Sequence, residues 1–400
     1  MDSAKQMMTF RGADEADWPA MSALTTLAFG SWQPPETEAV WRSMVAADGA
    51  VVACADTEVV GTALFLDLQL TVPGGAVLPM AGVSAVAVAP THRRRGALTG
   101  MFGELHRRMG GYPIAGLEAS EAGIYGRFGY GAATVWESLA VDRAGARFHP
   151  GVPDPGGARL VRPAEHRGRL EDIYERWRLR TPGGLATPER LWDEVLADRE
   201  PDRRGGTPFY CLLHDDGFAM FRLHGTGDAR TAEITKLAAA TTEAEIALWR
   251  VLIGLDLKKT VTLETHPDHL LRYLLTDPRL VRTTGVADGL WLRILDVPAV
   301  LEARTYGADL EVVLDIGDDF GGRGGRFALT VRDGRAHCVP TSEPPDVHLD
   351  LSVLGSLYLG AHRASAFASA QRLRCNDIGV VRALDAAFAT EVPAELGYGF

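Results

Sequence analysis

The stretch that decides the fold of this chain is Val83-Ser84-Ala85-Val86-Ala87-Val88-Ala89-Pro90-Thr91-His92-Arg93-Arg94-Arg95-Gly96-Ala97-Leu98. Its first six residues predict a buried strand, and a helix is predicted directly after the glycine. That helix buries one face, because apolar residues recur at helical spacing as Leu98, Met101, Phe102, Leu105 and Met109. Backbone N–H groups without partners collect at such a helix N-terminus, where the helix dipole adds partial positive charge. Gly96 permits a close backbone approach and the arginines add fixed charge, so the pattern predicts an anion site shaped for a pyrophosphate.

Two common nucleotide-binding loops are excluded by the sequence of this segment. A P-loop needs Gly-x-x-x-x-Gly-Lys-Ser/Thr, and a dinucleotide fold needs Gly-x-Gly-x-x-Gly after its first strand. Neither string occurs here. The plain alternative is a basic surface loop that precedes a buried helix.

Composition sets the broad class of the protein. The chain has 400 residues, of which 46% are hydrophobic and 23% charged, so two or three globular domains are expected. A net charge of −11 disfavours nonspecific nucleic-acid binding and weakly suits a cationic substrate. The four cysteines form no Cys-x-x-Cys pair, so we expect no metal site. Because neither a signal peptide nor a membrane-spanning run is present, we expect a soluble, cytoplasmic protein without a membrane partner.

The order of predicted elements divides the chain into three α/β (α+β) regions. Residues 1–147 form the first domain, and a linker rich in proline and glycine follows at 148–158. Residues 159–290 repeat a strand-then-helix order, but the link at 238–242 has no arginine or glycine, so this region lacks the anion loop. Residues 291–400 begin with short strands and continue with helices. Within the first domain, strands are predicted at 9–11, 50–56, 59–70, 83–88, 114–119 and 134–141, and helices at 18–27, 39–45, 98–109 and 121–128.

A second motif, Tyr125-Gly126-Arg127-Phe128-Gly129-Tyr130-Gly131, follows the predicted strand at 114–119. With the loop at 93–98, which has the form Arg-x-x-Gly-x after Val-x-Pro, it resembles the GCN5-related N-acetyltransferase (GNAT) superfamily. The three-region layout and the aromatic C-terminus narrow the resemblance to the enhanced intracellular survival (Eis) family of actinobacterial acetyltransferases. The resemblance implies a GNAT domain, a degenerate GNAT-like domain and a sterol-carrier-like domain. Leu98 departs from the pattern, in which a small residue ends the loop.

The Eis resemblance also implies roles for particular residues. Acetyl-CoA, used without a metal, would be bound by a set of strand and loop residues, namely Val86, Ala87, Val88, Arg93, Arg94, Gly96 and Ala97, with Ser120 beside it. Tyr125 would be the general acid, because a phenol with a pKa of about 10 can give a proton to a leaving thiolate at neutral pH. The C-terminal carboxylate of Phe400 would be the general base. Its intrinsic pKa of about 3.5 makes it weak unless it is desolvated or acts through water, so Glu118 and Glu121 stay open as alternatives.

The residues that bind the acceptor amine are the hardest to predict from the sequence. Phe29, Trp32 and Glu36 are candidate substrate residues, with Glu38 and Trp41 in the same early region, because aromatic and acidic side chains suit a polycationic sugar. Equally, Trp41 could be a core residue. The family implies acetylation of aminoglycoside amines, hence antibiotic resistance, and assembly as a homo-oligomer, a hexamer.

Two other functions remain open at this point. One is a non-catalytic acyl-CoA-binding sensor on the same fold, which would bind CoA without turnover. The other is a lipid carrier that uses residues 296–400, although that region could equally be a scaffold.

Overall fold

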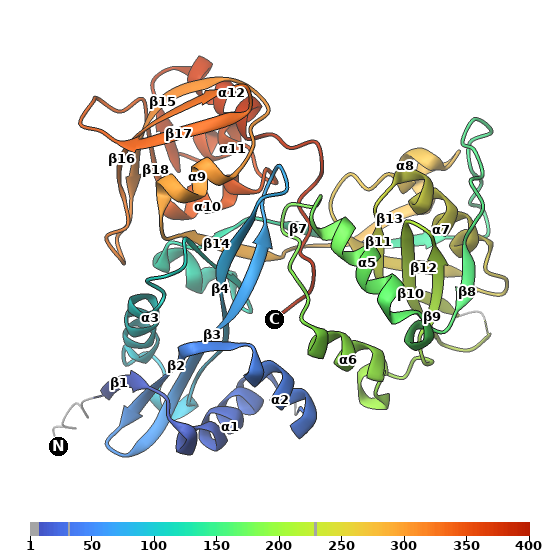
Figure 1. Ribbon diagram of the computed structural model, residues 1–400, viewed down its shortest axis with the longest axis horizontal. Coiled ribbons are helices and arrows are strands. Elements are labelled where there is room, and N and C mark those ends of the chain that lie inside the picture. Colours follow the sequence, from blue (N-terminus) through green and yellow to red (C-terminus); the bar gives the residue numbers. More distant parts are fainter. Residues whose placement is uncertain (1–7, 31–32, 228–229) are drawn as a thin grey trace. The chain divides into compact units, whose positions relative to one another are not determined.

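The computed structural model describes residues 8–30, 33–227 and 230–400. Three β-sheets organise these residues (Figure 1), and the chain divides into two compact units. The first unit comprises Met1–Ala133, Leu290–Thr390 and Tyr398–Phe400, and the second comprises Thr134–Gly289 and Glu391–Gly397. We describe each unit by itself.

The first sheet has the strand order β1-β2-β3-β4-β5-β14-β6. Its strands are β1 (Met8–Gly12), β2 (Val45–Ala55), β3 (Glu58–Thr71), β4 (Val77–Val88), β5 (Ile114–Glu118), β14 (Leu290–Ile294) and β6 (Gly131–Ala132). Its helices are α1 (Trp18–Phe29), α2 (Pro35–Ser43), α3 (Ala97–Arg108) and α4 (Ala122–Tyr125). The predicted strand, loop and helix at 83–109 are therefore confirmed, although β4 begins six residues earlier than expected.

The two faces of β3 have different neighbours. Ala63 and Phe65 belong to a buried core with Met101, Phe102 and Leu105 of α3. Because side chains alternate along a strand, the residues between them face the opposite way. That opposite face contributes to the cavity described below.

The sheet opens between β4 and β5. The two parallel strands are paired only over three positions, from Met80 with Ile114 to Gly82 with Gly116. Beyond them, β4 continues to Val88, whereas β5 pairs with β14 on its other side. The carboxyl ends of β4 and β5 therefore leave unpaired backbone groups along a fork, which is where ligands bind in open α/β sheets.

The second sheet has the order β13-β7-β12-β11-β10-β9-β8. Its strands are β7 (Val135–Asp142), β8 (Arg159–Val161), β9 (Tyr210–His214), β10 (Gly217–His224), β11 (Thr231–Ala239), β12 (Thr260–Thr265) and β13 (Val281–Asp288), with helices α5 (Arg167–Arg178), α6 (Glu189–Ala197), α7 (Thr242–Gly254) and α8 (Leu271–Leu274). In place of an anion loop, Thr241 caps α7 by accepting a hydrogen bond from the backbone of Ala244.

One strand differs from the domain limits expected from the sequence. β7 lies within residues 1–147, yet it pairs with β12 and β13 of the second sheet. The first unit is instead completed by β14, which pairs with β5. The boundary therefore falls after Ala133 rather than at 147. A pattern of alternating residues identifies a strand but does not specify which sheet it joins.

The third sheet completes the first unit, with the order β17-β16-β15-β18-β19. Its strands are β15 (Leu310–Gly317), β16 (Gly325–Arg332), β17 (Arg335–Pro340), β18 (Val347–Asp350) and β19 (Leu373–Cys375), with helices α9 (Val297–Ala303), α10 (Leu351–Tyr358), α11 (Ala364–Ser369) and α12 (Ile378–Phe388). A buried ion pair joins it to the first sheet, because Arg293 of β14 lies 2.7 Å from Asp318 and each side chain is about 1% exposed.

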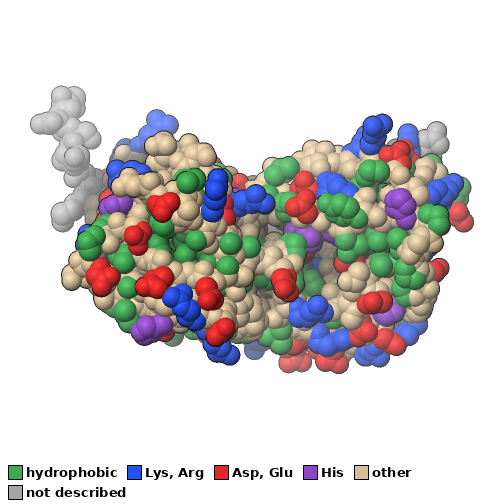
Figure 2. Space-filling model, turned by 90° about the horizontal axis from the view of Figure 1, so that it is seen from above, with side chains coloured by type: hydrophobic (Ala, Val, Ile, Leu, Met, Phe, Trp, Pro, Cys, Tyr) green, Lys and Arg blue, Asp and Glu red, His purple; other side chains and the backbone are tan. Residues whose placement is uncertain are grey.

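Acidic and basic side chains alternate over the surface that Figure 2 shows. That face therefore offers no broad basic area, among the described residues, of the kind that binds a nucleic-acid backbone. None of the helices formed by the described residues has the length and apolarity needed to cross a membrane.

Candidate active site

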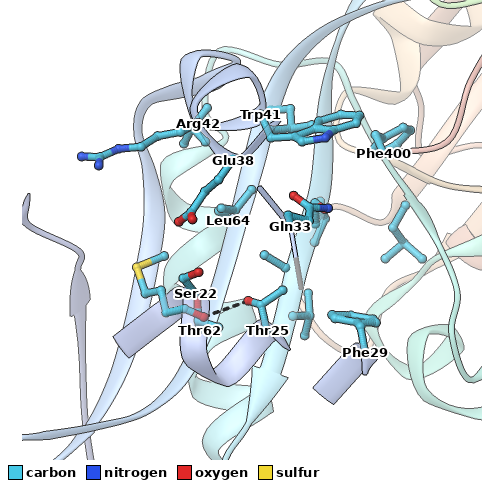
Figure 3. Close-up of a pocket in the computed structure, with 18 of the residues that line it drawn as sticks. Ser22, Thr25, Phe29, Gln33, Glu38, Trp41, Arg42, Thr62, Leu64 and Phe400 are labelled. Atoms are coloured by element: carbon cyan, nitrogen blue, oxygen red, sulfur yellow. Dashed lines mark hydrogen bonds between the residues drawn. The ribbon is translucent and has the colours of Figure 1, made fainter. Parts of the chain in front are cut away.

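A cavity of about 390 Å³ lies in the first unit, where the fork between β4 and β5 opens. Its walls come from α1, α2, β3, β4 and the end of β5, and the last two residues of the chain also line it (Figure 3). Five of the residues expected to be functional line this cavity, namely Phe29, Val86, Ser120, Tyr125 and Phe400, and Glu118 lines it with them.

A bulge in β4 shapes one wall of the cavity. Ser84 pairs with Leu64 and Ala87 pairs with Thr62, so two β4 residues oppose a single β3 residue. Ala85, in the bulge, has a φ of 51°, a left-handed conformation that costs energy in a residue with a side chain. A bulge leaves backbone groups unpaired in the ladder. The wall therefore presents main-chain polar groups that can bind a ligand carbonyl or amide.

The loop after β4 has the features of an anion site. Gly96 has a φ of 88° and precedes α3, which has no side-chain cap. Arg94 is also left-handed, with a φ of 60°. Arg95 separates these two residues, and a turn that contains left-handed residues can direct neighbouring backbone N–H groups toward an anion. Arg93 and Arg94 are exposed, and neither forms an ion pair with another described residue. Gly96 and the guanidinium groups can therefore receive a phosphate.

Tyr125 ends α4 and lies in the cavity wall, where only 6% of it is exposed. Its ring packs against Phe102 of α3 with centroids 5.9 Å apart. Burial raises the pKa of the phenol, and a hydrogen bond with Ser120 opposes that shift. The hydroxyl therefore keeps its proton at neutral pH and can act as a proton donor.

Glu118 and the last residue of the chain, Phe400, are in contact in the cavity wall. The backbone N–H of Phe400 donates a hydrogen bond of 2.8 Å to Oε2 of Glu118, the last residue of β5. Burial raises the pKa of Glu118, and the hydrogen bond from Phe400 opposes that shift. Glu118 can therefore supply a base, and Phe400 lies beside it.

The acceptor end of the cavity corrects one expectation from the sequence. Glu36 is exposed on α2 and does not line the cavity, whereas Glu38 does. Residues two apart on a helix point to different faces, and the sequence did not indicate which of them faces the sheet. Trp41 lines the cavity as well, and Trp32 lies outside the described residues.

The other expected cofactor residues are not among those that line the cavity. Ala87 and Val88 end β4, while Arg93, Arg94, Gly96 and Ala97 belong to the loop and the start of α3. The sequence analysis missed several hydroxyl side chains of the wall, among them those of Ser22, Thr25 and Thr62. Single serines and threonines in a helix or a strand carry no pattern that would have singled them out.

Comparison with known proteins identifies the family. Residues 9–133 and 183–294 each match an Acetyltransferase (GNAT) domain, and residues 297–394 match a Sterol carrier protein domain. N-acetyltransferase Eis of Mycobacterium tuberculosis is 52% identical over 406 aligned residues, which cover 98% of this chain and 100% of the relative. The chain belongs to the Eis family of N-acetyltransferases. The resemblance and the three-part fold class expected from the sequence are thereby confirmed.

A solved structure and a further sequence relative agree with this membership in the Eis family. The crystal structure of Eis1 from Mycobacterium abscessus has a TM-score of 0.88 and 31% identity, covering 98% of this chain and 100% of that one. An N-acetyltransferase of Streptomyces coelicolor is 36% identical over 88% of this chain and 87% of its own length. Acetyltransferases with the GNAT fold use acetyl-CoA. The fork, the bulge and the uncapped helix of this Eis-family enzyme fit the pantetheine amides and the pyrophosphate of that molecule.

Proposed function

We propose that this enzyme transfers the acetyl group of acetyl-CoA to primary amines of cationic small molecules, aminoglycosides among them. The observation that carries the proposal is the convergence of a proton donor and two carboxyl groups in one cavity. Tyr125, Glu118 and the end of the chain at Phe400 all line it. Acetyl transfer to an amine needs a group that accepts a proton and a group that donates one.

The proposed reaction is a direct attack. The amine nitrogen forms a bond to the acetyl carbonyl carbon, and the bond from that carbon to sulfur breaks. The carboxylate of Phe400 accepts the proton that the ammonium must lose before it attacks, directly or through water, and later releases it to solvent. Tyr125 gives its proton to the thiolate, and the second proton that the nitrogen loses as the amide forms restores the phenol of Tyr125 through water. Glu118 is the alternative base, because burial raises its pKa toward neutrality.

We assign acetyl-CoA to the fork and the loop. The backbone of Val86, Ala87 and Val88 would bind the pantetheine arm along the unpaired edge of β4. The pyrophosphate would contact a cluster at the start of α3, formed by Arg93, Arg94, Gly96 and Ala97. Ser120, which hydrogen-bonds to Tyr125, would lie beside the thioester. On the acceptor side, Phe29 lines the cavity.

The family membership supports three further parts of the proposal. The protein would act in the cytoplasm, assemble as a homo-oligomer, a hexamer, and lower the potency of aminoglycoside antibiotics. Sedimentation of the full chain tests the assembly, and a monomer would contradict it.

The experiment that tests the function measures the release of free thiol from acetyl-CoA in the presence of a panel of amines. We expect release with amines that carry several ammonium groups, and a mass increase of the acceptor by one acetyl group or more. In Tyr125→Phe the turnover should fall by about 10²-fold or more while acetyl-CoA still binds. Binding of CoA without turnover of any amine, and indifference to Tyr125→Phe, would instead favour a sensor.

A further inference from the structure

A polar corner lies at one end of the cavity, and the mechanism above does not use it. We define it by Ser22 and Thr25 of α1, Glu38 of α2 and Thr62 of β3. Figure 3 shows these four residues together, with the carboxylate of Glu38 pointing toward Ser22 and away from Phe400. Three hydroxyl groups and one carboxylate thus converge from three different elements.

Thr62 is the most informative member of the polar corner. It is fully buried, and its hydroxyl oxygen has no hydrogen-bond partner among the described residues. A buried hydroxyl without a partner destabilises a fold, and valine would fill the same volume without that cost. A ligand that bonds to the hydroxyl would account for its presence. The hydroxyl of Thr25 already donates to the backbone oxygen of Met21, at 2.9 Å, so toward a ligand it offers lone pairs.

Glu38 brings a charge that no described side chain neutralises. No ion pair or side-chain hydrogen bond joins it to another residue in the part of the chain that the structure describes. The nearby cation, Arg42, also lines the cavity, but its guanidinium points away from the carboxylate of Glu38 in Figure 3. Its guanidinium lies 4.2 Å from the centre of the Trp18 ring and pairs with Glu15. The polar corner is therefore a set of acceptors around an unpaired negative charge.

An apolar wall separates the polar corner from the reacting groups. Leu64 and Leu66 follow Thr62 on the same face of β3, and both line the cavity. The cavity therefore has two polar ends, one with Tyr125 and Phe400 and one with Glu38, joined by aliphatic side chains. A ligand that fits such a cavity has two polar groups joined by an apolar segment.

We propose that the polar corner binds a second, non-reacting ammonium group of the acceptor, so that the enzyme selects diamines whose two amines are joined by an apolar spacer. Glu38 supplies the charge and accepts one hydrogen bond. Because an ammonium group has three donors, two of the three hydroxyl groups of Ser22, Thr25 and Thr62 accept the others. The inference rests on the proposed acetylation of amines and adds a specificity site to it.

The test uses the full chain with a series of α,ω-diamines of increasing length, each paired with the monoamine of the same length. The quantity measured is the ratio of kcat/KM for the diamine to kcat/KM for the monoamine. We expect this ratio to fall about tenfold or more in Glu38→Gln, because a charged hydrogen bond is lost. In Thr62→Val, which keeps the volume of the side chain, we expect a fall of about threefold. The control is Glu36→Gln, on the exposed side of the same helix, in which the ratio should not change.

Three results would overturn the inference. The first is an equal ratio in Glu38→Gln and the wild type. The second is an equal loss with both classes of amine, and the third is a change in the KM for acetyl-CoA alone, which would assign the polar corner to that molecule. Calorimetric binding of the diamine to the wild type and to Glu38→Gln separates the two proposals. If no amine is acetylated, the proposed function fails, and weaker binding to Glu38→Gln still supports the polar corner, whereas equal binding overturns it.

Discussion

Adding one glycine after Phe400 is the sharpest test of the proposed base. The addition keeps every side chain of the cavity and moves only the terminal carboxylate. One residue extends a chain by about 3.8 Å, whereas a general base must lie within about 2.6–3.2 Å of its proton or act through one water. The displacement therefore exceeds the tolerance of the reaction.

The chain end has little freedom to slide back and compensate. A shift by one residue would bring Phe400 to the position of Gly399, where a β-carbon would lie 2.7 Å from Oε2 of Glu118. The same shift would remove the hydrogen bond of 2.8 Å that the backbone N–H of Phe400 donates to Glu118, because another residue would then occupy that position. We therefore expect kcat to fall by about 10²- to 10⁴-fold, the usual contribution of a positioned base.

Steady-state release of thiol, measured with one amine and saturating acetyl-CoA, gives kcat for each variant. The matched variant is Glu118→Gln, whose amide oxygen still accepts the hydrogen bond from Phe400 but carries no charge. If the terminal carboxylate is the base, the extended chain loses far more activity than Glu118→Gln. An extended chain that keeps kcat within about twofold would refute the assignment, and a large loss in Glu118→Gln would transfer the role to that residue.

Three further predictions concern the anion loop, the acid and the fold. Arg93→Ala should weaken acetyl-CoA binding by about tenfold or more in calorimetry, whereas Arg159→Ala, at an exposed position of β8, should leave it unchanged. Because burial raises the pKa of Tyr125 above its ordinary value of 10.0, kcat should fall only as the pH rises above that value; a fall that persists in Tyr125→Phe would contradict the role of the acid. Asp318→Asn should lower the free energy of unfolding in urea by about 3–5 kcal/mol, because Arg293 stays buried without a charged partner. The control is Glu311→Gln, which breaks an exposed ion pair with Arg332 and should lower the free energy of unfolding by less than about 1 kcal/mol. The pKa of Asp318 is lowered from 3.8 to about 2, so the wild type keeps this stabilisation above pH 3.8 and loses it as the pH falls toward 2.

The strand, loop and helix of the proposed cofactor site were predictable because their signal is local. The helix predicted from Leu98 begins at Ala97, and the strand ends at Val88 as expected. The start of β4 was missed because Pro79 and Gly82 resemble breaks in a strand. In the sheet, β4 pairs with β5 only from Met80 onward. Pro79 has no backbone N–H to donate, and it is tolerated because no strand on that side requires a hydrogen bond from it.

The remaining errors concern long-range arrangement. The sheet that β7 joins depends on pairing with β12 and β13, which come more than a hundred residues later. The choice between Glu36 and Glu38 depends on how α2 is rotated against the cavity, and the short helix has too few apolar residues to fix that rotation. Local patterns therefore identify elements and motifs, whereas partners and orientations follow from the complete chain.

Gly82 connects the separate features of the site. It ends the pairing of β4 with β5, and the bulge at Ala85 follows three residues later. A β-carbon at this position would lie 2.9 Å from the ring of Phe400 and 2.4 Å from Leu68. The absence of a side chain thus leaves room for the end of the chain at the point where the sheet opens. The fork that would hold acetyl-CoA and the place of the proposed base therefore depend on the same residue, which explains why a glycine occurs inside an otherwise apolar strand.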